Sequence, residues 1–188
     1  MLTKEDFSFS QNLAFKVVWK SSAPSKTAGF AWLVLLDRIP TRANLFRRQV
    51  LRGDDEQCCV FCRREVETTS HLFLYCNGIM QVWDRVFRWL GMKFSLPHTI
   101  TSILNLMAST RGSKQARRGM VMIWISLIWM VWRHRNRIIF ENGSVNLTEL
   151  LDDVKIMSWK WWIGKLNSPP PLLYEWISEP TICLARGC

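Results

Sequence analysis

Residues 58–76, CCVFCRREVETTSHLFLYC, gather four of the six cysteines and one of the three histidines of the chain. Thiolate sulfur and imidazole nitrogen are the ligands that Zn²⁺ prefers, and four of them in a tetrahedron form a closed structural site. The candidates are two cysteines separated by two residues, then a histidine after eight more, then a cysteine after four more: Cys59, Cys62, His71 and Cys76. The stretch therefore predicts a metal centre holding one structural zinc ion.

The spacing leaves alternatives open. Cys58 could replace Cys59 as the first ligand, although the two-residue gap between Cys59 and Cys62 is the commoner turn. If Cys59 is the ligand, Cys58 is expected to pack as a small buried hydrophobe. The four residues could also be unrelated core side chains, or a redox Cys-x-x-Cys pair, for which the expected strand-then-helix setting is absent. Four protein ligands leave no position for a reacting water, so the metal interpretation is structural, not hydrolytic.

The local backbone must bring His71 and Cys76 together, although they are five residues apart. On a regular α-helix such positions lie about 140° apart around the axis. We therefore expect a short helix over about 69–75 that breaks near Cys76, with Gly78 permitting the break. Three thiolates and a neutral imidazole around a dication leave a charge of −1, which Arg63 and Arg64 can offset.

The elements around this stretch are predicted to be helical. The composition, 48% hydrophobic and 21% charged with eleven tryptophans, indicates a globular chain with an aromatic core. We expect a loop through residue 29 and a helix over 30–36, then a second helix capped by Thr41 that runs to Val50 and is closed by Gly53. Further helices are expected at 78–91, from about 116 to Asn142-Gly143, and at 147–166, where the last is stopped by the prolines of 168–171.

The resulting fold class is mostly α: a small zinc-stabilised helical domain followed by a Trp-rich helical C-terminal region. The predicted division is a lead-in over 1–18, the zinc-binding domain over 19–91, a linker over 92–116, a helical region over 117–167 and an irregular tail over 168–188. Tryptophans 159, 161 and 162 could stack on bases, but core packing is the preferred interpretation.

The most apolar run, MVMIWISLIWMVW at 120–132, has thirteen residues. A spanning helix needs about twenty, and arginines bound the run closely, so we interpret it as a buried helix and expect no membrane association. The N-terminal residues, MLTKEDFSFSQ, lack the apolar run of a secretory signal. We therefore expect an intracellular protein, nuclear or cytoplasmic and not secreted, with reduced cysteines.

The net charge of +10 favours contact with polyanions such as RNA or DNA. Candidate phosphate-binding residues cluster on or before the second predicted helix: Arg38, Arg42, Arg47, Arg48 and Arg52. A solvated helical face, with cations near a helix C-terminus, is the competing interpretation.

A second basic group could form a nucleic-acid patch or a nuclear address: Arg133, His134, Arg135 and Arg137. Cations in the last turns of a helix are, however, common without function. His134 and His98 have no partners at ligand spacing and are expected to be surface or capping residues.

Residues 19–84 resemble the reverse-transcriptase zinc-binding domain of LINE-type, non-LTR retrotransposon polyproteins, which are abundant in plants. The resemblance is carried by Trp19, Pro24, Lys26, Phe30, Trp32, the run RIPT at 38–41, Leu45, Arg48, Glu67-Thr68, HLF at 71–73, Trp83 and the cysteines. It implies zinc ligation by Cys59, Cys62, His71 and Cys76, with Cys58 outside the set. Downstream, Trp132, Arg135-Asn136 and Ile139-Phe140 resemble the segment that often follows this domain.

A reverse transcriptase of this kind has a palm domain with an aromatic-x-Asp-Asp hairpin. After position 55 the only adjacent aspartates are Asp152-Asp153, in a pattern typical of an amphipathic helix, and no clustered carboxylates suggest a ribonuclease H site. We therefore expect a non-catalytic zinc-binding module that contacts RNA or DNA through Arg42, Arg47, Arg48 and Arg52. The alternatives are a zinc-shaped module that binds a protein partner through its apolar C-terminal helices, or an inert relic of an element.

Overall fold

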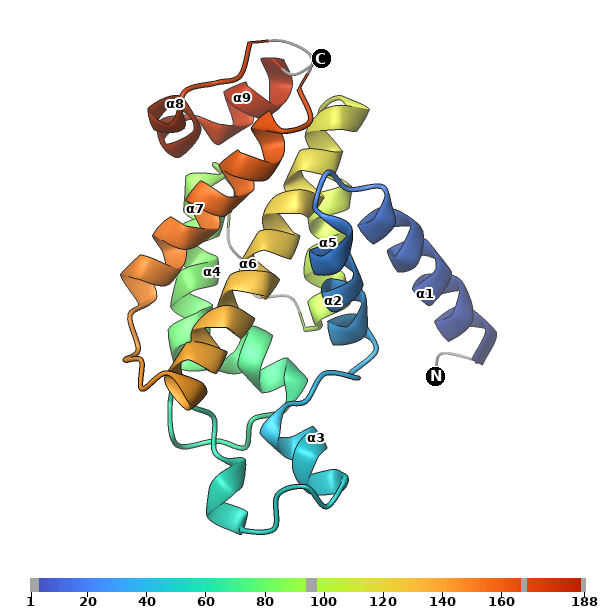
Figure 1. Ribbon diagram of the computed structural model, residues 1–188. Coiled ribbons are helices and arrows are strands. Elements are labelled where there is room, and N and C mark those ends of the chain that lie inside the picture. The colour runs from blue at the N-terminus through green and yellow to red at the C-terminus, as the bar shows by residue number, and fades with distance from the viewer. Residues whose placement is uncertain (1–3, 94–97, 167–168, 187–188) are drawn as a thin grey trace.

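The computed structural model describes residues 4–93, 98–166 and 169–186. The fold is 68% helical, with no strand among the described residues, which confirms the mostly α class. Figure 1 shows the elements as a helical bundle, with the chain between α3 and α4 lying below it. The elements are α1 (Lys4–Trp19), α2 (Ser25–Leu35), α3 (Arg42–Arg47), the 3₁₀ turn η1 (Asp54–Gln57), the π-helical turn η2 (His71–Tyr75), α4 (Asn77–Trp89), α5 (Ile100–Ala108), α6 (Lys114–Phe140), α7 (Leu147–Ile163), α8 (Leu173–Ser178) and α9 (Pro180–Arg186).

The long helix α6 forms the centre of the bundle. Its apolar run is buried nearly all round, with Trp124 and Ile125 fully excluded from solvent. A helix that is apolar on every side must be covered on every side, and α7, α5 and α2 pack around it (Figure 1). The predicted buried helix is confirmed. None of the described helices combines the length and apolarity needed to cross a bilayer.

Helix α4 buries one face against the core, as its period predicted. The apolar residues of that face are Ile79, Val82, Trp83, Val86 and Phe87. The helix ends at Trp89, and Gly91, just beyond its C-cap residue, has a φ of 65°, the left-handed conformation that glycine adopts without strain.

The N-terminal helices differ in their limits from the prediction. The loop expected through residue 29 is shorter, because Pro24 begins α2 by accepting N–H bonds from Thr27 and Ala28. Thr41 caps α3 as predicted, with its side chain accepting from the Asn44 N–H at 3.3 Å. Helix α3 ends at Arg47 and not at Val50, because Gln49, with φ 59°, turns the chain. Gly53 is therefore not the closing residue.

Two segments expected to be irregular contain helices. Within the predicted linker, Thr99 caps α5, which buries Ile103, Leu104 and Met107 in the core; residues 94–97 lie outside the described part of the chain. In this region a short apolar run between turn signals, ITSILNLMA, proved to be a helix.

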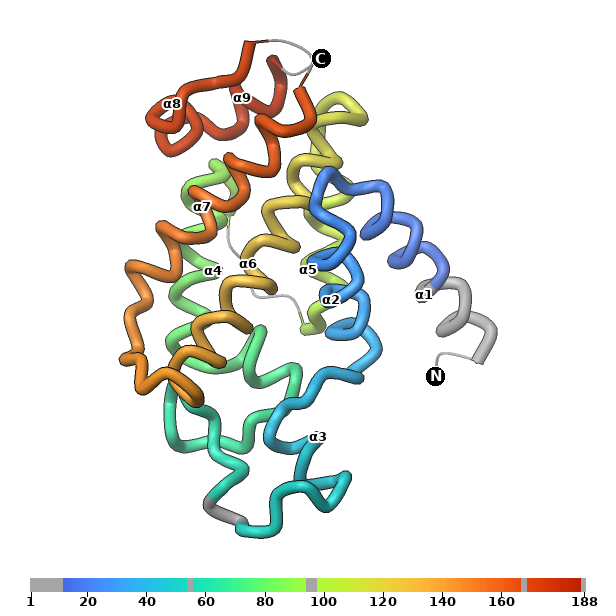
Figure 2. The backbone as a smooth tube through the Cα atoms, in the orientation of Figure 1, coloured from blue at the N-terminus to red at the C-terminus, as the bar shows by residue number. Residues whose placement is uncertain are grey.

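The predicted irregular tail forms α8 and α9, which lie across the ends of α6 and α7 (Figure 2). Trp176 of α8 is fully buried and packs on Trp162 and Trp89. These contacts join residues far apart in sequence, so no local pattern revealed them. They also confirm that Trp162 serves the core, and the indole N–H of Trp159 donates to the Pro171 carbonyl at 2.9 Å.

Close packing at Gly119 gives a prediction about stability. A methyl group there would overlap the side chain of Leu184 and lie 2.9 Å from Trp162 Cζ3. We expect Gly119→Ala to destabilise the fold by about 1–3 kcal/mol, although alanine is the better helix former. Gly29→Ala, also inside a helix but 3.9 Å from its nearest contact, should stabilise by up to about 1 kcal/mol. Urea unfolding followed by circular dichroism measures both, and equal effects would contradict the packing at Gly119.

Candidate metal centre

Four ligand atoms converge below the bundle, between α3 and α4. They lie within 4.8 Å of one another and belong to Cys59, Cys62, His71 and Cys76. The Sγ atoms of Cys59 and Cys76 are 4.0 Å apart, and Cys62 Sγ lies 3.3 Å from His71 Nε2. Sulfurs about 2.3 Å from a central zinc ion would be about 3.8 Å from one another in a tetrahedron. The donor set and its spacing therefore fit a single tetrahedral ion.

The first two ligands lie on a tight turn, residues 58–67, which we call the metal turn. Its two arms are joined by the Cys59 N–H bond to the Glu65 carbonyl at 2.8 Å, and by a bridge between Cys58 and Val66. The bend is closed by the Arg63 N–H, which donates to the Cys59 carbonyl at 2.7 Å. Arg63 itself adopts φ 54°. This path turns both sulfurs of the Cys-x-x-Cys pair to one side.

The other two ligands lie at the ends of η2. The N–H of Cys76 donates to the His71 carbonyl, five residues earlier, at 2.7 Å. This wide turn resolves the geometric conflict of the sequence, because it brings together two side chains that a regular α-helix would separate. The predicted break at Cys76 is confirmed, since Cys76 is extended with ψ 126°. Gly78 does not make the break: it lies in the first turn of α4, where a Cβ would be 3.2 Å from Leu147.

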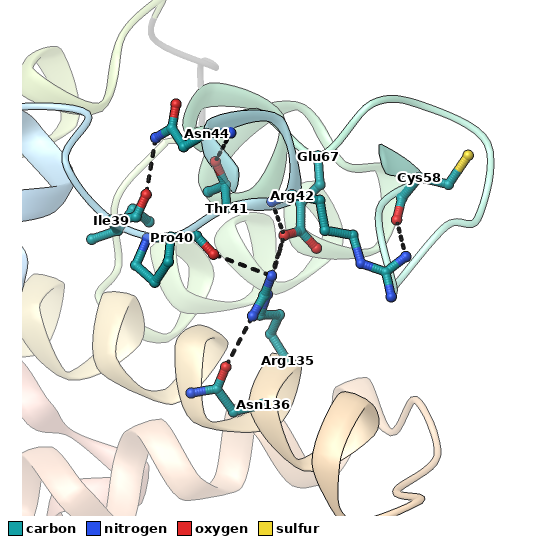
Figure 3. Close-up of polar contacts among 9 residues, drawn as sticks. All are labelled: Ile39, Pro40, Thr41, Arg42, Asn44, Cys58, Glu67, Arg135 and Asn136. Atoms are coloured by element: carbon teal, nitrogen blue, oxygen red, sulfur yellow. Dashed lines mark hydrogen bonds and ion pairs between the residues drawn. The ribbon is translucent and has the colours of Figure 1, made fainter. Parts of the chain in front are cut away.

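Cys58 is not among the four converging residues. Its carbonyl accepts a hydrogen bond from Arg42 Nη1 at 2.8 Å, and Figure 3 shows its sulfur directed away from the polar contacts around Glu67. The side chain is half-buried, so the expectation that it packs as a buried hydrophobe is wrong. The adjacent Cys59 is fully buried. The two neighbours point to different surroundings because successive residues of an extended chain face opposite ways.

Protonation acts on the site in two senses: the state of His71 favours metal binding, whereas the Cys59 proton opposes it. A hydrogen bond to Cys76 and burial raise the pKa of the Cys59 thiol, while acceptance of that bond lowers the pKa of Cys76 against the effect of burial. Burial lowers the pKa of His71, opposed by the charges of Glu65 and Glu67. The imidazole is therefore neutral at pH 7 and its lone pair is available. A metal ion must displace the Cys59 proton, so its affinity rises with pH.

A buried ion pair joins the metal turn to α6 (Figure 3). Glu67 is fully buried, and its Oε1 accepts from Arg135 Nε at 3.1 Å and Nη2 at 2.7 Å. The same oxygen accepts from the Arg42 N–H at 3.1 Å. Arg135 is held by further contacts, to the Pro40 carbonyl at 3.4 Å and over the Trp132 ring at 4.6 Å. No local sequence pattern predicts this role for either residue, because the partners are 68 positions apart.

Most side chains of the basic group at 133–137 bind acidic side chains of the protein itself. Besides Arg135, His134 is buried with Nε2 2.8 Å from Asp153 Oδ2, and Arg137 pairs with Glu149 at 2.7 Å. The expectation that His134 is a surface residue is therefore wrong, and Asp153 is not simply solvated. Arg133 remains exposed.

The predicted phosphate-binding arginines lie around α3. Arg47, Arg48 and Arg52 are exposed, and Arg47 lies 4.0 Å from Asp37. Arg42 is partly buried against the metal turn. Their role in nucleic-acid binding stays a prediction.

Residues 3–83 match the family model described as zinc-binding in reverse transcriptase. The match includes all four converging residues and ends within α4, so it covers less than half of the chain. It supports a reverse-transcriptase zinc-binding domain in this region, a domain distinct from the catalytic one. No curated protein and no solved structure matches the chain.

The adjacent cysteines provide a matched test of the ligand set. We expect Cys59→Ser to lose stoichiometric metal, because hydroxyl is a poor replacement for a buried thiolate ligand. Cys58→Ser should bind one ion as the unchanged protein does. Cobalt titration, read from the thiolate-to-metal absorption bands, measures both variants. Loss of binding in Cys58→Ser, with Cys59→Ser unaffected, would assign the first ligand to the wrong residue.

The buried ion pair gives a prediction about stability. Arg135→Met leaves the Glu67 charge without its partner and should destabilise the fold by about 3–5 kcal/mol. Adding Glu67→Gln, which retains an acceptor for the Arg42 N–H, should recover much of that loss. Arg133→Met, on the same helix but exposed, should change stability by less than about 0.5 kcal/mol. Equal urea midpoints for the two methionine variants would contradict the importance of the pair.

Proposed function

We propose that this chain is a non-catalytic, zinc-stabilised module that associates with nucleic acid and derives from the reverse transcriptase of a plant LINE-type element. The observation that carries the proposal is the convergence of four zinc-type ligand atoms within 4.8 Å, inside the segment that matches the reverse-transcriptase zinc-binding family.

Zinc would be held by Cys59, Cys62, His71 and Cys76, the CCHC set. Bound there, the ion supplies a cross-link between the metal turn and η2, and on the order of 10 kcal/mol of folding free energy. All four positions are taken by side chains, which supports a structural role over a catalytic one. The proposal includes an intracellular, reducing environment, because the cysteines must stay reduced to bind the ion.

Charge supports nucleic acid as the partner. The chain carries a net charge of +10, and Arg47, Arg48 and Arg52 are exposed together beside the metal turn. Exposed guanidinium groups attract a phosphate backbone chiefly through counterion release. This position would place the backbone next to the zinc-stabilised turn.

A second candidate function is binding of a protein partner. It is favoured by the apolar side chains that α8, α9 and the residue before them expose: Leu172, Tyr174, Ile177 and Ile182. In that case zinc would stabilise the module without contacting the partner. The same experiment distinguishes the two functions, because only phosphate contact depends steeply on salt. An inert relic would bind neither partner.

We expect the purified protein to contain one zinc ion and to bind single-stranded RNA with an affinity that falls steeply as salt is added. Reversing three charges beside the metal turn, with Arg47→Glu, Arg48→Glu and Arg52→Glu combined, should abolish the binding. The control is the equal reversal Lys114→Glu, Arg117→Glu and Arg118→Glu, at exposed positions in the first turns of α6, away from the metal turn (Figure 1).

Metal analysis and fluorescence anisotropy at several salt concentrations measure these outcomes. Zinc content near zero with an unchanged helical spectrum would end the zinc proposal. No RNA or DNA affinity at low salt would leave the protein-binding function.

A further inference from the structure

A pocket of about 470 Å³ lies between the metal turn and the C-terminal part of α6. Arg42 and Arg63 contribute its two cationic side chains. Its apolar lining includes Val60 from the metal turn and the neighbouring pair Ile138 and Ile139 from α6. The volume is within the range of about 300–1,000 Å³ that is typical of small-molecule sites.

Both guanidinium groups have capacity for an anion. Arg42 uses Nη1 to bond the Cys58 carbonyl, which fixes its direction (Figure 3) while its remaining N–H groups can serve a ligand. Arg63 is exposed at the bend of the metal turn. None of the ion pairs found in the described part of the chain involves either residue. Their charge of +2 exceeds the −1 of a loaded Cys₃His centre, so the pocket attracts anions.

The remaining lining selects among anions. Ile138 and Ile139 are each half-buried, so part of their apolar surface remains exposed to solvent. A bare phosphate ion would leave this surface unused. A nucleotide would cover it with the face of its sugar and base while its phosphate reached the arginines, because guanidinium binds phosphate oxygens through paired N–H groups.

We propose that this pocket binds one nucleotide of a single-stranded nucleic acid, with its phosphate on Arg42 and Arg63 and its sugar and base against Val60, Ile138 and Ile139. The inference rests on the proposed nucleic-acid function and assigns it a specific site. It also places part of that site on α6, outside the segment that matches the zinc-binding family.

Arg63→Asn tests the cationic side of the pocket. Asparagine removes the charge and still tolerates the left-handed backbone at φ 54°. The matched control is Arg64→Asn, which removes the same charge at the next position, also exposed but outside the pocket lining. With a fluorescein-labelled single-stranded RNA at low salt, Arg63→Asn should weaken binding roughly tenfold and lower the salt slope by about one. Arg64→Asn should have a clearly smaller effect.

Ile139→Glu tests the opposite wall independently, by placing a carboxylate in the pocket. Its control is Phe140→Glu, because Phe140 is the next residue, is 75% exposed and lies outside the lining. Ile139→Glu should reduce RNA binding roughly tenfold or more, and Phe140→Glu much less. In competition, 5′-AMP should displace the labelled RNA at lower concentration than inorganic phosphate.

The outcomes separate this inference from the broader function. If the unchanged protein binds RNA or single-stranded DNA but each variant equals its control, the pocket assignment is overturned and the nucleic-acid function stands. Equal competition by phosphate and 5′-AMP overturns the nucleotide assignment. If the unchanged protein binds neither nucleic acid, both proposals fail. Cobalt stoichiometry and the helical spectrum of each variant verify that it is folded.

Discussion

The buried carboxylate of Glu67 imposes a constraint on which the arrangement around the metal turn depends. A charge with no exposure to water must be paired and hydrogen-bonded where it lies, and here Arg135 and the Arg42 N–H supply those partners. Arg135 can do so only if α6 lies directly against the metal turn. A single ion pair therefore links α6, which contains the most apolar run of the sequence, to the metal turn. Because this pair joins them, α6 and the metal turn are expected to fold cooperatively.

The metal turn has little else to hold it in place. Between Arg48 and Val66, only Cys59 and Val60 are buried among the residues whose side chains are described. Such a segment cannot repay its conformational entropy through apolar burial. A bound ion that joins the turn to η2 would supply the missing free energy. The molecule thus combines two sources of order: an aromatic core around α6, and metal coordination below it. The ion pair of Glu67 and Arg135 connects the two.

Sequence patterns predicted the features whose cause is local. Thr41 caps its helix through its own side chain, α4 follows from its apolar period, and the break at Cys76 follows from the five-residue spacing to His71. Features that depend on distant partners were missed. The helical structure of the tail depends on the packing of Trp176 against Trp162 and Trp89. The burial of His134 depends on its contact with Asp153 of α7. The four ligand candidates lie within one short stretch, so the sequence could predict that they converge. It could not predict that Glu67 pairs with a residue of α6, because that partner is far away in the sequence. The predicted division into domains stays a prediction.

The wide turn of η2 has a consequence for how this segment can evolve. Deleting one residue between His71 and Cys76 would leave them four positions apart, and a regular α-helix places two such side chains on one face. Adding one would leave them six positions apart, which separates them by about 120° around the axis of a regular helix. Between Cys62 and His71 the ion pair of Glu67 fixes one position, but the exposed bend at Arg63 and Arg64 has irregular backbone that can change in length. Natural variation in length is thus expected at the exposed bend before the imidazole, whereas the gap after it is expected to shorten by one residue sooner than to lengthen.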